Sequence, residues 1–179
     1  MNETIKNLIS RRSIRKFKTE QIRDDELNQI LEAGTYAPTG MNQQSPKIIV
    51  IQDKEIRDKL SKLNSSFLWS EDANEKFDPF YGAPTVIVVL ANKNIKTYVE
   101  DGSLVLGNLM NAAYSLGIGS CWIHRAKEEF ESKEGKELLK NWNISDDYVG
   151  IGHCILGYPD ENLNAKSSSR KPDYITYIR

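Results

Sequence analysis

An apolar strand followed by a long apolar helix forms the expected centre of this chain. After Pro84, the run Thr85–Ala91 (TVIVVLA) has the character of a strand that is buried on both faces. The segment from Val99 to Leu116 then carries apolar residues at helical spacing on more than one side, which predicts a central helix. A chain of 179 residues, 39% of them hydrophobic, can bury such a core as one domain.

Further helices and strands are expected on both sides of this centre. Periodicity and capping residues predict helices at Thr4–Ser10, from Asp24 to just before Ala37, from Asp53 to about Leu63, and at Lys133–Trp142. Strands are expected at Lys47–Ile51, at the end of Gly117–Ile123, at Val149–Pro159 and at Tyr174–Ile178. Gly117 should cap the central helix in the left-handed conformation. The irregular alternation of these elements indicates an α+β or mixed α/β sandwich.

The composition excludes several classes of protein. A formal net charge of −1 does not favour broad binding to nucleic acid or to acidic membranes. No apolar run reaches the ~18 residues of a membrane span, and Met1–Ser10 lacks a signal-peptide core, so the cytoplasm is the expected location. Two cysteines, Cys121 and Cys154, are too few for a disulfide framework. A metal centre would need both of them to converge with both histidines, and we expect none.

The segment RRSIRKFK near the start is the first candidate binding site. Arg11, Arg12 and Arg15, with Lys16 and Lys18, surround Ser13 beside an expected helix end. Arginine forks and a hydroxyl are suited to hold a phosphate monoester. A solvated basic face balanced by the acids of the next helix is the alternative interpretation.

Two more segments could meet a ligand. The loop within APTGMNQQSP offers neutral donors and acceptors that could bind the edge of a heterocycle, although for this segment taken alone a plain connection between helix and strand is the favoured interpretation. GIGSCWIHR is no dinucleotide fingerprint, because its glycines follow a helix and precede a strand. The aromatic residues of 64–82 could line a pocket, and a satellite packing cluster is the more common explanation.

No covalent catalytic group emerges from the sequence. Cys121 and His124 stand three residues apart at a strand, which points them to opposite faces, and no P-loop, G-x-S-x-G or H-E-x-x-H motif is present. Any redox or transfer chemistry would therefore come from a cofactor.

Taken in order, these segments resemble the nitroreductase family of FMN proteins, in its small single-domain branch. The shared order is RRSIRKF, APTGMNQQSP, APTVIVV, a long apolar helix ending in LGIGSCWI, then LGYP, and a basic SSRKP near the C-terminus. The resemblance implies an α+β fold, a three-layer sandwich with a mixed, mainly antiparallel sheet flanked by helices. It also implies an interlocked homodimer with FMN at its interface. Residues 1–179 would form one FMN-binding domain, with 160–179 as an extension that reaches the partner subunit.

The resemblance also assigns cofactor-binding residues. The family positions that bind the phosphate and ribityl chain of FMN and approach its pyrimidine end correspond to Arg11, Arg12, Ser13 and Arg15. The basic pair that completes the phosphate site corresponds to Arg170 and Lys171. The loop that meets the flavin, partly from the neighbouring chain, corresponds to Pro38, Thr39, Gly40, Asn42 and Gln44. The segment along the isoalloxazine ring corresponds to Trp122, Ile123 and His124.

Two positions depart from the family pattern. Ser45 and Pro46 stand where a proline and an aromatic residue are frequent, which leaves the end of the loop undefined. Thr39 replaces a frequent serine and keeps the hydroxyl.

The function implied by the resemblance is an FMN-dependent oxidoreductase. It would pass electrons from NAD(P)H to nitroaromatics, quinones or similar small oxidants by a ping-pong mechanism, with no catalytic side chain and no metal. One alternative is a flavin-binding relative that acts as a store, a sensor or a flavin-modifying enzyme. Another is a non-enzymatic module for some other phosphorylated ligand.

Overall fold

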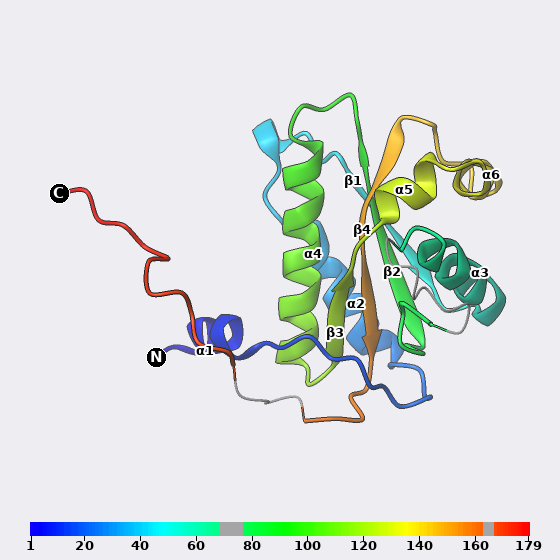
Figure 1. Ribbon diagram of the computed structural model, residues 1–179. Coiled ribbons are helices and arrows are strands. Elements are labelled where there is room, and N and C mark those ends of the chain that lie inside the picture. Colours follow the sequence, from blue (N-terminus) through cyan, green and yellow to red (C-terminus); the bar gives the residue numbers. More distant parts are fainter. Residues whose placement is uncertain (69–76, 163–166) are drawn as a thin grey trace.

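A four-stranded sheet lies between two layers of helices in the computed structural model, which describes residues 1–68, 77–162 and 167–179 (Figure 1). The strands are β1 (Pro46–Ile51), β2 (Thr85–Asn92), β3 (Gly119–Ile123) and β4 (Tyr148–Gly157). The helices are α1 (Glu3–Ser10), α2 (Asp24–Thr35), the short η1 (Gly40–Asn42), α3 (Lys54–Ser65), α4 (Tyr98–Ser115), α5 (Ala126–Glu131) and α6 (Lys133–Asn141). The predicted α+β sandwich in three layers is confirmed.

The sheet has the order β1-β2-β4-β3, and each neighbouring pair is antiparallel. Parallel pairing in the described residues is limited to one bridge, between Ser13 and Ser120. The sheet formed by this chain is thus antiparallel, and the mixed character expected for it is confined to that bridge.

Strand β2 is buried on both faces, as predicted. Ile87, Val89 and Ala91 pack against α2 and α4, whereas Val86, Val88 and Leu90 face the layer of α3, α5 and α6. Alternate side chains of a strand point to opposite faces, so a strand between two layers must be apolar at every position.

Helix ends follow the local signals. Asp53 accepts a hydrogen bond from the N–H of Ile56 at the start of α3. Gly117 has φ +75° after α4, with its N–H bonded to the Tyr114 carbonyl and that of Ile118 to the Ala113 carbonyl. This is the Schellman arrangement, which needs a left-handed residue, and the predicted role of Gly117 is confirmed.

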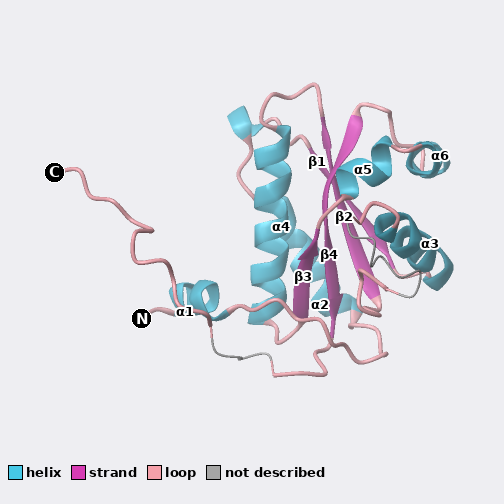
Figure 2. Ribbon diagram, in the orientation of Figure 1, coloured by secondary structure: helices cyan, strands magenta, loops and turns pink. Residues whose placement is uncertain are grey.

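The predicted strand at Tyr174–Ile178 forms no strand within this chain. Figure 2 shows residues 167–179 as a loop that passes α1 and runs away from the sheet. The apolar side chains of the tail are exposed, with Ile178 at 93%. They pair with no strand of their own chain in the described residues, and pairing with a partner's sheet stays a prediction.

Candidate functional site

The two basic segments meet at one hollow of about 760 Å³. Arg11, Arg12 and Ser13 line it from the end of α1, and Ser167–Ser169 with Arg170 line it from the tail. We call it the basic hollow. Lys171 is exposed and does not line it. The chain thus brings together three arginines from its two ends, and their charges attract an anion.

Arg11 has donor capacity to spare in this hollow. Its Nη1 atom is buried and has no hydrogen-bond partner among the residues that the structure describes. Arg12, in contrast, donates to the carbonyls of Ile9 (2.9 Å) and Arg11 (2.7 Å), which closes the end of α1. A buried donor without a partner is costly unless a ligand oxygen completes it, so the hollow fits a phosphate group.

A second hollow, of about 180 Å³, lies beside the end of β3. We call it the ring hollow, and it is lined by Arg15, Phe77, Pro79, Tyr81, Cys121, Trp122, Ile123, His124 and Arg125. Arg15 belongs here, with its guanidinium carbon 6.0 Å from the centre of the Tyr81 ring. The bridge between Ser13 and Ser120 ties the segment Arg11–Arg15 to β3. One extended segment therefore runs from the basic hollow to the ring hollow.

The aromatic residues of 64–82 divide between the two alternatives considered above. Phe80 is fully buried and packs in the core. Phe77 and Tyr81 line the ring hollow and pack edge to face, with their ring centres 5.7 Å apart. Asp78 fixes their turn by accepting bonds from the N–H groups of Phe80 and Gly82. Trp69 lies outside the described residues.

Arg125 holds the segment that leads out of β3, a role that no pattern in the sequence predicted. Its backbone is left-handed, with φ +75°, and its guanidinium donates to Oδ1 of the buried Asn64 at 2.7 Å. Asn64 also donates to the His124 carbonyl at 2.8 Å. Asn64 thereby fixes the backbone next to Trp122 and His124, and left-handed geometry at a bulky residue persists only where its surroundings impose it.

The loop Pro38–Gln44 lies apart from both hollows. Thr39 and Gln44 line a separate hollow of about 320 Å³ with Ile48 and Val105. Pro38 and Asn42 are exposed, and Gly40 lies against Thr97 at the start of α4.

The loop and the basic hollow are at opposite ends of α4 (Figure 1). Gly40 donates to Asp101 in the first turn of α4, whereas Asn7 of α1 donates to the Asn111 carbonyl near its last turn. The helix has 18 residues and is about 27 Å long. One chain therefore does not bring its own loop to the ligand that its own basic hollow would hold.

The cysteines and histidines do not form a common site. Cys121 and His153 belong to the side of the sheet that faces α5, and Cys154 packs on the α4 side. In the described ranges, no three His, Cys, Asp or Glu side chains gather as a metal ion would require. Burial, with a smaller effect of Cys121, raises the pKa of the Cys154 thiol, so this thiol is protonated at neutral pH.

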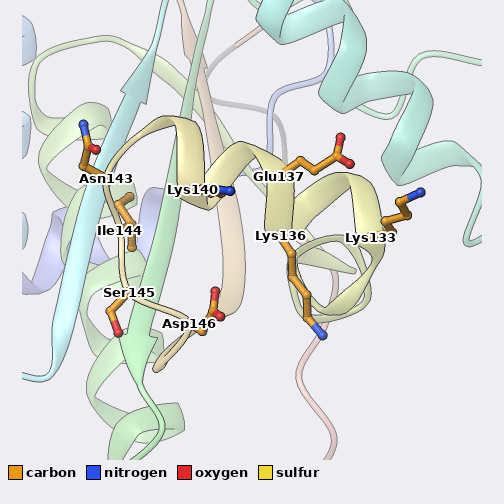
Figure 3. Close-up of a pocket in the computed structure, with 8 residues that line it drawn as sticks. All are labelled: Lys133, Lys136, Glu137, Lys140, Asn143, Ile144, Ser145 and Asp146. Atoms are coloured by element: carbon orange, nitrogen blue, oxygen red, sulfur yellow. The ribbon is translucent and has the colours of Figure 1, made fainter.

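A larger hollow, of about 970 Å³, lies on the outer surface of α6. Figure 3 shows that Lys133, Lys136 and Lys140 diverge there and do not point to a common centre. None of the motif residues lines it. It is an open surface formed by α6 and by the loop Asn143–Asp146 that follows it.

Comparisons with known proteins agree on one family. The model of the nitroreductase family matches residues 8–158. An Archaeoglobus fulgidus protein, provisionally named as an NADH dehydrogenase/NAD(P)H nitroreductase, is 32% identical over 90% of this chain and 88% of its own length. Crystal structures of nitroreductases with bound FMN from Bacteroides fragilis and Desulfitobacterium hafniense each share 29% identity over the full length of both chains, with TM-scores of 0.90 and 0.88. No helix in the described part of the chain combines the length and apolar character needed to cross a bilayer.

Proposed function

This chain belongs to the nitroreductase family, and from that membership we propose that it is an FMN-dependent enzyme. It takes electrons from NAD(P)H and passes them to a small oxidant such as a nitroaromatic or a quinone. The observation that carries the proposal is the pair of hollows joined by Arg11–Arg15. One hollow is basic, and the other is flanked by aromatic residues.

The residues of the basic hollow would hold the FMN phosphate. Arg11 offers the buried Nη1 donor, Ser13 a hydroxyl, and Arg170 a second guanidinium from the tail. Charge-assisted bonds of this type are about twice as strong as neutral ones. With no dinucleotide fold in the sequence, the site suits a mononucleotide.

The residues of the ring hollow would receive the flavin ring. When bound, FMN supplies the hydride and electron chemistry, so the protein needs no catalytic side chain of its own. Arg15 places positive charge at the ring hollow and would stabilise negative charge that develops on reduction. Asn64 and Arg125 hold the Trp122–His124 backbone in place. Phe77 and Tyr81, packed edge to face, flank the position where donor and oxidant would bind in turn, in a ping-pong cycle.

We further propose that the working unit is a homodimer with FMN at its interface. The separation of the Pro38–Gln44 loop from the basic hollow supports this, because a two-fold axis across α4 would bring the loop of one chain to the hollow of the other. Apolar side chains that are exposed on α1, α4 and the nearby loop also support a dimer, because exposed apolar surface favours an interface. They are Ile5, Leu8, Ile9, Tyr36, Met41, Val99 and Leu104.

The absorption spectrum of the purified protein tests the proposal. We expect a yellow protein that releases FMN, and not FAD, on denaturation and whose flavin is bleached by NADH or NADPH without oxygen. A flavin that is not bleached would favour a store or sensor. A colourless protein that ignores added FMN would leave only a module for another phosphorylated ligand.

A further inference from the structure

We propose that Asp101 and Ser45 are positioning residues that fix the loop Thr39–Gln44 for its contact with the flavin. This inference rests on the proposed function. It concerns the serine that departs from the family pattern at the end of the loop.

Asp101 is a buried carboxylate whose hydrogen bonds come from the loop and from its own helix. The residue is 2% exposed, and its Oδ1 accepts the backbone N–H of Gly40 at 2.9 Å. Its Oδ2 accepts the hydroxyl of Ser45 at 2.6 Å and that of Thr97 at 3.2 Å. A buried carboxylate needs such donors, since its desolvation is otherwise uncompensated.

The same carboxylate holds both ends of the loop. Gly40 stands at its start and Ser45, itself 3% exposed, directly follows its last residue. Between these two points the backbone is left-handed at three non-glycine residues, Met41 (φ 50°), Asn42 (φ 56°) and Gln44 (φ 47°). This conformation is unfavourable for side-chain-bearing residues and requires outside support. The tie between Gly40 and Ser45 provides that support.

The fixed loop presents its polar side chains outward. Asn42 and Gln44 are exposed, and the Gln44 amide donates to Asn42 Oδ1 at 3.3 Å. The hydroxyl of Thr39 accepts the Gln44 N–H at 3.1 Å, which uses the hydroxyl that threonine retains at this position. Asp101 and Ser45 themselves face inward, so they act on the flavin only through the loop.

The Ser45→Ala variant of the full-length protein, as purified with its flavin, tests the anchor. Ser103→Ala is the matched control, because Ser103 is half-buried and its hydroxyl donates only to the Val99 carbonyl of the same helix in the described residues. Asp101→Asn is the second variant, since an amide keeps only one acceptor oxygen. Two quantities are measured: hydrogen exchange at the loop amides of residues 40–44, and the rate of FMN release on dilution, followed by flavin fluorescence.

We expect Ser45→Ala to raise both the loop exchange and the FMN release rate about tenfold or more, the usual effect of losing a bond to a charged group. Asp101→Asn should change both in the same direction, while α4 exchange and the Ser103→Ala control stay at parent values. Unchanged loop exchange would overturn the anchor. Faster exchange with unchanged FMN release would overturn its role at the site. Failure of the proposed function itself is separately visible, because the parent would then carry no FMN.

Discussion

The imidazole of His153 and the carboxylate of Glu129 meet inside the molecule, with Nε2 2.7 Å from Oε2 and neither side chain exposed. The two atoms are within ion-pairing distance, but their relative orientation is not that of a hydrogen bond. The Phe80 ring packs against the imidazole at a tilt, with the ring centres 5.2 Å apart. The imidazole Nδ1 is 3.4 Å from the Ile123 carbonyl oxygen. The pair therefore joins α5 and β4 next to Ile123, which lines the ring hollow.

Removing one partner of this pair should destabilise the fold strongly. We expect Glu129→Leu to lower the free energy of unfolding by about 3–5 kcal/mol, the range for breaking a buried pair. The double variant Glu129→Leu/His153→Phe should lose less, because replacing both partners by apolar groups removes the uncompensated polarity. Urea unfolding measures both, and Glu131→Gln on the exposed side of α5 is the control. A single variant as stable as the parent would contradict the prediction.

Arg11 should contribute more to phosphate binding than Lys18, a basic residue of the same segment that lies outside the basic hollow. Arg11→Ala removes a buried donor and should weaken FMN binding by about 1.5–3 kcal/mol, or roughly 10- to 150-fold. Lys18→Ala removes the same charge from the same segment at an exposed position outside the hollow, and is expected to change binding little. Titration calorimetry with FMN gives both affinities. If both variants lost the same FMN affinity, the basic segment would act only through its overall charge and not through a specific contact of Arg11.

The raised pKa of Cys154 makes stability depend on alkaline pH. The folded thiol keeps its proton while the unfolded one loses it above about pH 8.5, so stability falls as pH rises past that value. Each further pH unit costs up to about 1.4 kcal/mol until the folded pKa is reached. Cys154→Ala should show a shallower decline between pH 8.5 and 10 in urea unfolding, and should still oxidise NAD(P)H. Parallel curves for parent and variant would exclude this contribution.

Gly40 cannot carry a side chain without moving its neighbour. A Cβ atom there would lie 2.4 Å from Thr97 Oγ1 and 2.9 Å from its Cγ2. Gly40→Ala should therefore displace the loop, cost about 1–3 kcal/mol of stability and weaken FMN binding. Thr97→Ala removes both close atoms together with one donor to Asp101, so the double variant should recover part of the FMN affinity. No recovery would mean that Gly40 is required for another reason.

Local patterns sufficed for most of the fold but not for the contacts that shape the site. Some features depend only on residues close together in the chain, and these could be predicted. They are the apolar run of β2, the Asp53 cap of α3 and the left-handed Gly117 after α4. Helix α5 escaped prediction because Arg125 before it supplies no capping side chain. The bonds that Arg125 donates to Asn64 and Ser45 donates to Asp101 join residues 61 and 56 positions apart, and no periodic pattern in the sequence predicts such pairs.

The C-terminal tail gives the last prediction, which concerns the dimer. Tyr174, Ile175, Tyr177 and Ile178 are between 68% and 93% exposed in the single chain, and an apolar strand-like segment of this kind needs a partner. We expect it to pair with the other subunit, and so to hold Arg170 in the basic hollow. Deleting Pro172–Arg179 should then lower dimer stability and FMN affinity together, although Arg170 and Lys171 remain. Sedimentation and flavin absorbance measure the two effects, with Tyr174→Ser/Ile178→Ser as a full-length companion variant. A truncated protein that is still a tight, FMN-loaded dimer would show that the tail is dispensable.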